Sequence, residues 1–131
     1  MPKKLTPVLF VPEIESVLPL WVDRLGFSKT AEVPDDGKLA FVILHKDGVE
    51  VMYQSLASLA KDVPALEASA RTGRTFLYIE VESLDAIKKV IHGFEVYMPE
   101  RTTFYGSKEI GIKDPAGHFL TFAEFGAPPQ T

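Results

Sequence analysis

A chain of 131 residues with 46% hydrophobic and 24% charged side chains has the size and composition of one compact globular domain. It contains no cysteine, which excludes disulfides, thiolate metal sites and cysteine nucleophiles, and its formal charge of −4 without an extended basic cluster argues against nucleic-acid binding. The amino end lacks the apolar core of a signal peptide, and no apolar run reaches the roughly 18 residues of a membrane span, so we expect a soluble, cytoplasmic protein without a membrane partner.

The first half of the chain predicts a strand, a helix and three further strands. Residues 5–11 alternate like a strand, and Ser16 is placed to cap the helix that follows. Turn-forming residues at 34–37 and 46–48 then separate strands at 27–33, 38–45 and 49–54. The buried side of the helix is expected to carry Leu18, Trp21, Val22 and Leu25.

The second half repeats this order. Residues 75–81 alternate like a strand, and Ser83 is placed to cap a helix that runs to about Ile91. Three strand candidates follow at 95–98, at 102–113 with a break near Gly106, and at 118–125. The chain is therefore predicted to hold one βαβββ module at 5–54, a linker with a short helix at 55–74, a second module at 75–125, and a tail at 126–131.

The clearest local signal is a hairpin near the carboxyl end. The turn Asp114-Pro115-Ala116-Gly117 has proline where φ of about −65° is required and glycine where positive φ is tolerated. Apolar residues alternate with small or polar ones on both sides of this turn, which predicts one core face and one face of mixed chemistry. The first face carries Ile110, Ile112, Leu120 and Phe122, and the second carries Glu109, Gly111, Thr121 and Ala123.

A module of this kind covers only one face of its sheet with its helix, so the other face needs a different cover. Two modules, in one chain or exchanged across a dimer, would form a curled mixed sheet around an open trough, with the helices on the outer face. We therefore expect an α+β fold in a single domain, with any ligand in the trough. Both arrangements bury the same faces, so the choice between them stays open.

Three segments carry a resemblance to a known family. They are Val11 with Trp21 and Leu25-Gly26-Phe27; residues 47–54; and residues 104–124, which include Asp114-Pro115-Ala116-Gly117-His118. On these residues, which extend over nearly the whole chain, the sequence resembles the vicinal oxygen chelate superfamily. Its members include glyoxalase I, extradiol dioxygenases, and fosfomycin and bleomycin resistance proteins, and the last segment does not distinguish among them.

The resemblance implies where a metal ion would bind. Enzymes of the superfamily hold a divalent ion on inward-facing His and Glu side chains of corresponding strands, and these positions fall here at Thr6, Glu50, Phe76 and Thr121. Only Glu50 is a good ligand, whereas a divalent ion needs about three or four N or O donors. We therefore expect no metal ion and no cofactor, which indicates the metal-free branch that is similar to the bleomycin resistance proteins, small dimers that sequester a drug between subunits.

On this interpretation the protein is a metal-independent binding protein of the antibiotic-resistance type, which sequesters an amphipathic or cationic small molecule in an aromatic trough. Carboxylates in the trough would attract a cation, and if Glu50 and Glu109 share it, one of them should have a raised pKa. The expected partners are this ligand and a second copy of the chain in a homodimer. The ligand-binding candidates are Phe10, Glu50, Met52, Phe76, Tyr78, Glu109 and Thr121.

Other interpretations stay open, including whether the protein is an enzyme. Glu50 is the best catalytic candidate if the protein is a metal-dependent lyase or dioxygenase that resembles glyoxalase. It also fits an ordinary strand glutamate that faces open solvent or pairs with Lys108 or Lys113. A trough closed by dimerisation would bind nothing. His118 is expected to point away from the trough, and the helical spacing of Trp21 favours a place in the core.

Overall fold

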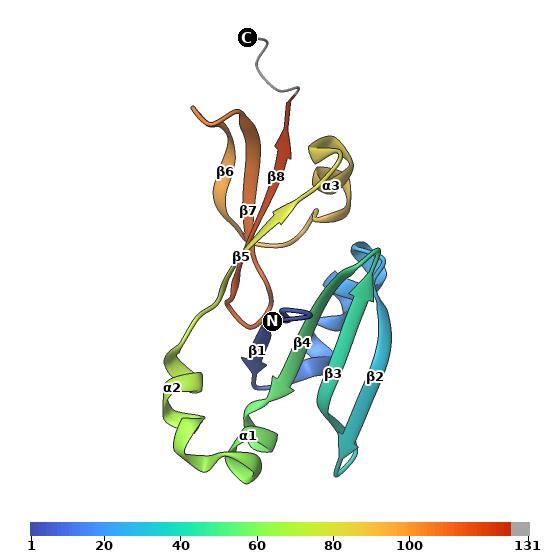
Figure 1. Cartoon of the computed structure of the whole chain (residues 1–131), viewed down its shortest axis with the longest axis vertical. Coiled ribbons are helices and arrows are strands. Elements are labelled where there is room, and N and C mark those ends of the chain that lie inside the picture. The colour runs from blue at the N-terminus through green and yellow to red at the C-terminus, as the bar shows by residue number, and fades with distance from the viewer. Residues whose placement is uncertain (127–131) are drawn as a thin grey trace. The chain divides into compact units, whose positions relative to one another are not determined.

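A computed structural model describes residues 1–126, and the chain divides into two compact units, 1–74 and 75 onwards. Each unit contains one four-stranded mixed sheet with helices, so the predicted α+β class and the repeated order of elements are confirmed (Figure 1). The predicted tail at 126–131 lies, apart from Gly126, outside the described residues. None of the described helices is long and apolar enough to span a membrane.

The sheet of the first unit has the strand order β1-β4-β3-β2. The first pair, β1 with β4, is parallel, and the other two pairs are antiparallel. The segment predicted as a linker follows β4 and folds into two short helices with a 3₁₀ turn between them. The bounds are β1 Val8–Val11, β2 Ser28–Asp35, β3 Lys38–Lys46, β4 Val49–Ser55, α1 Leu56–Asp62, η3 Pro64–Leu66 and α2 Glu67–Thr72.

The helix predicted between β1 and β2 differs from expectation. It consists of a 3₁₀ turn, η1 (Ile14–Ser16), and a π-helix, η2 (Pro19–Arg24), and the Ser16 hydroxyl donates to the Glu13 carbonyl instead of capping a helix. Wider π turns, in which the Leu25 N–H donates to the Leu20 carbonyl at 2.9 Å, change which side chains face the sheet. Leu20 is therefore buried, whereas Leu18 and Val22 are only half-buried.

Trp21 lies in the core of the first unit, as predicted. Its exposed fraction is 2%, and its indole N–H donates to the Tyr53 hydroxyl at 2.9 Å. This bond satisfies two polar groups that would otherwise be buried without partners. The surrounding side chains come from one face of the sheet and from η1 and η2: Leu9, Val11, Ile14, Leu20, Val42, Leu44 and Val51.

The sheet of the second unit repeats the arrangement with the strand order β5-β8-β7-β6, and β5 with β8 is again the parallel pair. Helix α3 begins after Ser83, whose hydroxyl accepts from the Ala86 N–H at 3.2 Å, so the predicted cap is confirmed. The break predicted near Gly106 is confirmed, because residues 103–106 form a turn with Gly106 at φ +91° and separate β6 from β7. The bounds are β5 Phe76–Glu80, α3 Leu84–Val90, β6 Val96–Thr102, β7 Ser107–Lys113 and β8 Phe119–Phe125.

The predicted hairpin joins β7 and β8. Asp114 Oδ1 accepts from the N–H groups of Ala116 and His118, each at 2.9 Å, and Gly117 has φ +91°. His118 is buried, and its Nδ1 accepts from the Thr75 N–H at 2.9 Å. The His118 imidazole therefore links the start of the second unit, at Thr75, to the hairpin between β7 and β8.

Candidate functional site

One face of the second sheet packs against α3, and the opposite face carries aromatic and polar side chains. The β5–β8 register places Phe76 beside Phe119 and Tyr78 beside Thr121. The rings of Phe76 and Phe119 stack with centroids 4.5 Å apart and an interplanar angle of 7°. Phe76 is nevertheless 72% exposed and Tyr78 53% exposed. This helix-free face is therefore a large aromatic surface that the described residues leave open.

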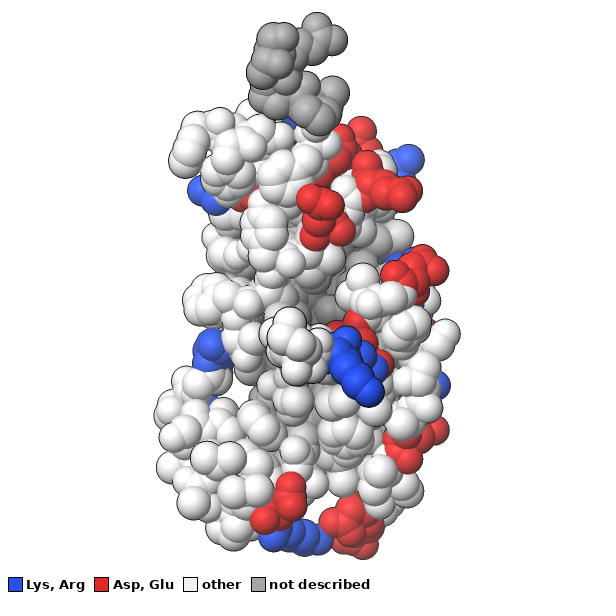
Figure 2. Space-filling view, viewed as in Figure 1, with Lys and Arg blue, Asp and Glu red and all other residues white. Residues whose placement is uncertain are grey.

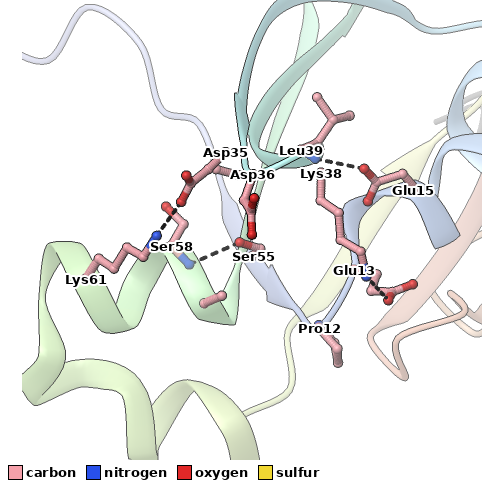
Figure 3. A pocket seen from close by; sticks show the side chains of 12 residues that line it. Pro12, Glu13, Glu15, Asp35, Asp36, Lys38, Leu39, Ser55, Ser58 and Lys61 are labelled. Carbon is pink, nitrogen blue, oxygen red and sulfur yellow. Dashed lines mark hydrogen bonds and ion pairs between the residues drawn. The ribbon is translucent and has the colours of Figure 1, made fainter.

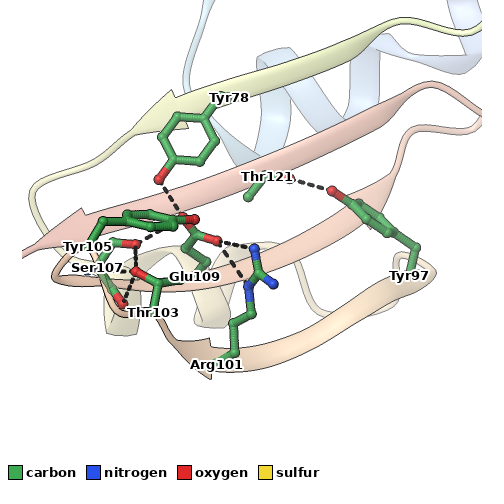
Figure 4. A network of polar contacts seen from close by, with 8 residues as sticks. All are labelled: Tyr78, Tyr97, Arg101, Thr103, Tyr105, Ser107, Glu109 and Thr121. Atoms are coloured by element: carbon green, nitrogen blue, oxygen red, sulfur yellow. Dashed lines mark hydrogen bonds and ion pairs between the residues drawn. The ribbon is translucent and has the colours of Figure 1, made fainter.

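Glu109 lies in the middle of this face and is fully buried, with an exposed fraction of 0%. Its Oε1 accepts from Arg101 Nε at 3.1 Å and Nη2 at 2.9 Å. Its Oε2 accepts from the hydroxyls of Tyr78, Tyr105 at 2.7 Å, and Ser107 at 2.9 Å (Figure 4). Donors from β5, β6, β7 and the turn before β7 thus converge on one carboxylate. We call these five residues the Glu109 cluster.

Contacts within the cluster lower the pKa of Glu109 and raise the pKa of Tyr78. Burial acts to raise the pKa of Glu109, but hydrogen bonds from Tyr78, Tyr105, Arg101 and Ser107 outweigh it and lower the pKa to about 2. Burial and the hydrogen bond to Glu109 raise the pKa of Tyr78 to about 12. The carboxylate therefore stays ionised and the phenol stays protonated across the physiological range.

Tyr97 covers the neighbouring part of the face. Its hydroxyl shares a hydrogen bond with the Thr121 hydroxyl, and its ring packs edge-on against Phe119 with centroids 5.0 Å apart. The ring lies directly over Gly111, where a β-carbon would overlap it. Glycine at this position therefore gives the Tyr97 ring its place on the sheet.

The first sheet carries its own carboxylate, Glu50, on the face that holds Phe10 and Met52. Lys4 Nζ lies 2.9 Å from Glu50 Oε1, and the Thr6 hydroxyl donates to the same oxygen at 2.9 Å. These two contacts, the Lys4 hydrogen bond first, lower the pKa of Glu50. The pKa of Glu109 is lowered as well, so neither carboxylate has the raised pKa that was expected if the two shared a trough.

The predicted ligand-binding residues fall into two groups. Phe10, Glu50 and Met52 lie in the first unit, and the register places them on one face of its sheet. The other group lies on the helix-free face of the second sheet and comprises Phe76, Tyr78, Glu109 and Thr121. Of this second group, Tyr78 and Glu109 are in direct contact.

Strand pairing shows which positions of the two units correspond. Val8 pairs with Met52 as Tyr78 pairs with Thr121. Val8 and Tyr78 are equivalent, because each is followed three residues later by a valine that leads into the helical segment. The counterpart of Thr121 is therefore Met52, two residues beyond Glu50, and its thioether is a poor ligand for a hard divalent ion. Within residues 1–126, no three His, Cys, Asp or Glu side chains gather closely enough to hold a metal ion.

Several residues of the site were not predicted. Arg101 was missed because two register shifts, between Val96 and Met98 and between Met98 and Arg101, interrupt the alternation of β6. Ser107 and Tyr97 were missed as well. The one signal that could have found Arg101 is its position near Glu109 across a short turn, where opposite charges on paired strands attract.

Several charged side chains of the first unit pair with one another. Six of the twelve residues that line a pocket in the first unit are charged (Figure 3). There Lys61 Nζ lies 2.6 Å from Asp35 Oδ2, and Lys38 Nζ lies 2.8 Å from Glu13 Oε1. On the face drawn in Figure 2, the Lys and Arg side chains of the described residues stand apart from one another. The Glu109 cluster is therefore the more distinctive site.

A comparison with protein-family models finds no match, and neither does a comparison with curated proteins. Solved structures do match. A glyoxalase/bleomycin resistance protein/dioxygenase from Nocardioides is 19% identical, with a TM-score of 0.70 over 100% of this chain and 91% of the other. A lactoylglutathione lyase from Agrobacterium tumefaciens is 14% identical, with a TM-score of 0.74 over 95% of both chains. A superfamily member from Sphaerobacter thermophilus is 17% identical, with a TM-score of 0.71 over 95% of this chain and 98% of the other. The chain therefore has the fold of the glyoxalase, bleomycin resistance and dioxygenase proteins.

Proposed function

We propose that the protein binds an amphipathic small molecule, without a metal ion, on the helix-free face of the second unit. The observation that carries this proposal is the exposed aromatic surface of Phe76 and Tyr78, which lies beside the buried and fully hydrogen-bonded Glu109. Large exposed apolar surface rimmed by polar groups marks binding sites on folded proteins. The cluster holds the polar part of the face rigid, so a ligand need not order it.

Ionisation supports binding over proton transfer. An efficient general acid or base has a pKa near the working pH, which is about 7 in most cells. Glu109 has a pKa of about 2 and Tyr78 of about 12, so neither exchanges a proton readily at that pH. We infer that the cluster positions a ligand without transforming it. Sequestration of the bleomycin-resistance type fits this role, because it needs affinity alone.

The alternative function is a metal-dependent lyase or dioxygenase. One similar solved structure is named a lactoylglutathione lyase, at 14% identity. At the four positions that the family resemblance assigns to the metal ion, Thr6, Glu50, Phe76 and Thr121 offer one carboxylate, two hydroxyls and a ring, which suit a divalent ion poorly. Metal analysis of protein purified without chelator separates the two functions, since stoichiometric zinc, nickel, iron or manganese would contradict the metal-free proposal.

Binding can be measured with 2-naphthamide, a neutral planar probe, by titration followed with NMR chemical shifts. We expect Phe76→Ala to weaken binding roughly tenfold, because it removes one of the stacked rings. Leu66→Ala is the control, since Leu66 is a 49% exposed apolar side chain that belongs to η3 of the first unit. Equal affinity of both variants and the wild type, or no binding at all, would overturn the proposal.

We also propose that the protein is a cytoplasmic homodimer. The open aromatic face supports this, because a second copy would supply the cover that the described residues do not. Light scattering at micromolar concentration tests the dimer, and a monomer would contradict it. If dimerisation alone buried the face, Phe76→Ala would weaken the dimer while no probe bound.

A further inference from the structure

We propose that the ligand carries a carboxylate next to its aromatic body, and that Arg101 binds this carboxylate through the edge of its guanidinium that Glu109 leaves open. This inference rests on the proposed function and specifies the charge of the ligand. The ligand is an anion, whereas the carboxylates of the sequence suggested a cation.

Glu109 has no remaining capacity for a cationic ligand. A carboxylate offers about four lone-pair sites, and Glu109 accepts five hydrogen bonds from Arg101, Tyr78, Tyr105 and Ser107. It is also fully buried, so a ligand ammonium group would have to displace one of these donors to reach it. The negative charge of Glu109 is thus used within the protein.

Arg101 is in the opposite situation. A guanidinium has five N–H donors, and only its Nε and one N–H of Nη2 donate to Glu109, both to Oε1. Figure 4 shows the third nitrogen pointing away from the carboxylate. The Arg101 side chain is 54% exposed although its partner is buried. An edge made of Nη1 and Nη2 therefore remains at the surface, and two parallel N–H groups match a carboxylate.

The three hydroxyl donors explain why Arg101 retains attraction for a second anion. Tyr78, Tyr105 and Ser107 all donate to Oε2, so the charge of Glu109 is stabilised by neutral groups as well as by the guanidinium. Without them, Glu109 would depend on Arg101 alone. Because the hydroxyls share in stabilising Glu109, the positive charge of Arg101 still attracts an anion at the protein surface.

An aromatic surface lies within reach of this edge. The Tyr78 hydroxyl and the Arg101 guanidinium both donate hydrogen bonds to Glu109, from β5 and β6 on either side of it. Rows of side chains on one face of a strand are spaced by about 7 Å, so Phe76 lies one row beyond Tyr78. A planar ring system that packs on the Tyr78 ring would place a substituent only a few bonds away at Arg101, and Phe76 extends the apolar surface on the far side of Tyr78. The geometry points to an aromatic carboxylate of about two fused rings.

Two other charged side chains on this face, Glu80 and Lys113, could also anchor a charged ligand. Glu80 shares a row with Glu109 and is exposed, so it is the group that a cationic ligand would use. Lys113 lies at the other end of the face, 2.9 Å from Glu95 and 5.6 Å from the Phe119 ring centroid. Arg101 is favoured over both as the anchor because its position is fixed by two hydrogen bonds to a buried group.

The test uses three probes with the same rings, namely 2-naphthoate, 2-naphthamide and 2-naphthylmethylammonium. We expect the wild type to bind 2-naphthoate about tenfold more tightly than the other two, as a charge-assisted pair of hydrogen bonds implies. Arg101→Gln should remove this preference, so that the variant binds 2-naphthoate and 2-naphthamide with equal affinity. Lys108→Gln is the matched control, because it removes the same charge from the opposite face of β7 and should keep the preference.

Arg101→Lys is the second variant, to be used if Arg101→Gln fails to fold, because a lysine can keep an ion pair with Glu109. It should lose most of the preference for 2-naphthoate, because an ammonium group lacks the paired parallel N–H groups of a guanidinium. A preference for the ammonium probe that Glu80→Gln abolishes would overturn the inference while supporting the proposed function. If the wild type binds all three probes equally and Phe76→Ala weakens all of them, the inference is overturned and the proposed function is supported. If none of the probes binds, both the inference and the proposed function fail.

Discussion

The two units place a glutamate on the same kind of sheet face but hold it in different ways. Glu50 of the first unit is 13% exposed and relies on Lys4, a side chain that is itself 64% exposed. Glu109 of the second unit is completely buried and receives donors from three strands and a turn. An exposed ion pair contributes little because water and salt screen it, whereas a buried carboxylate must be fully hydrogen-bonded to persist. The difference indicates that only the second unit is built around its carboxylate.

The strongest test of this comparison is acid unfolding. Glu109 has an ordinary pKa of 4.5 when unfolded and about 2 when folded. A lowered pKa stabilises the protein above pH 4.5, and this contribution, on the order of 3 kcal/mol, is lost as the pH falls towards 2. Free energies of unfolding measured over this range should therefore fall less steeply in Glu109→Gln than in the wild type. Glu50→Gln should follow the wild type closely, and identical curves for all three proteins would contradict the comparison.

Removing the buried carboxylate should be the next largest effect. Glu109→Leu leaves the buried Ser107 hydroxyl and the neighbouring donors without their acceptor, which costs about 1–3 kcal/mol in the free energy of unfolding. Urea unfolding at pH 7 measures it, with Glu50→Leu as the control. We expect the control to shift the midpoint much less, and a larger shift in the control would reverse the assignment.

Gly111→Ala tests the support of the aromatic part of the face. Its β-carbon would overlap the Tyr97 ring, so we expect a loss of about 1–3 kcal/mol in thermal or urea unfolding. The double variant Gly111→Ala with Tyr97→Ala removes the overlap and should lose less than the sum of the single changes. Strict additivity would show that the Tyr97 ring does not depend on this glycine.

Tyr78→Phe should have the smallest effect. It removes one of the donors to Oε2 of Glu109 and keeps the ring, so we expect a loss of about 1 kcal/mol. Binding of 2-naphthamide should be unchanged, because the exposed ring surface is retained. A loss of probe affinity as large as that of Phe76→Ala would show that the hydroxyl contacts the ligand directly.

The sequence predicted the fold more fully than the site. Turns such as 114–117 and the alternation around them are local signals, and the repeated order of elements follows from them. The π-helix at 19–24 was not predicted, because its hydrogen bonds depend on how the segment packs against the sheet. The lowered pKa of Glu109 was not predicted, since the sequence displays the carboxylate but not which hydroxyls donate hydrogen bonds to it.

Strand irregularity explains the remaining gap at the site. Phe76, Tyr78, Glu109 and Thr121 lie on regular strands, where a period of two assigns each side chain to a face. Arg101 follows two register shifts in β6, and a shift of one residue reverses the face of every side chain beyond it. Lys4 precedes the first strand, so the alternation of a strand cannot predict on which face its side chain lies.

The bond between Trp21 and Tyr53 has a practical consequence. Trp21 is the single tryptophan of the chain, and of its four tyrosines only Tyr53 belongs to the first unit. Indole emission therefore reports on residues 1–74 alone, while phenol absorbance is dominated by the aromatic face of the other unit. Recording both optical signals in one sample would show, without any label, whether the two halves lose their structure together or one after the other.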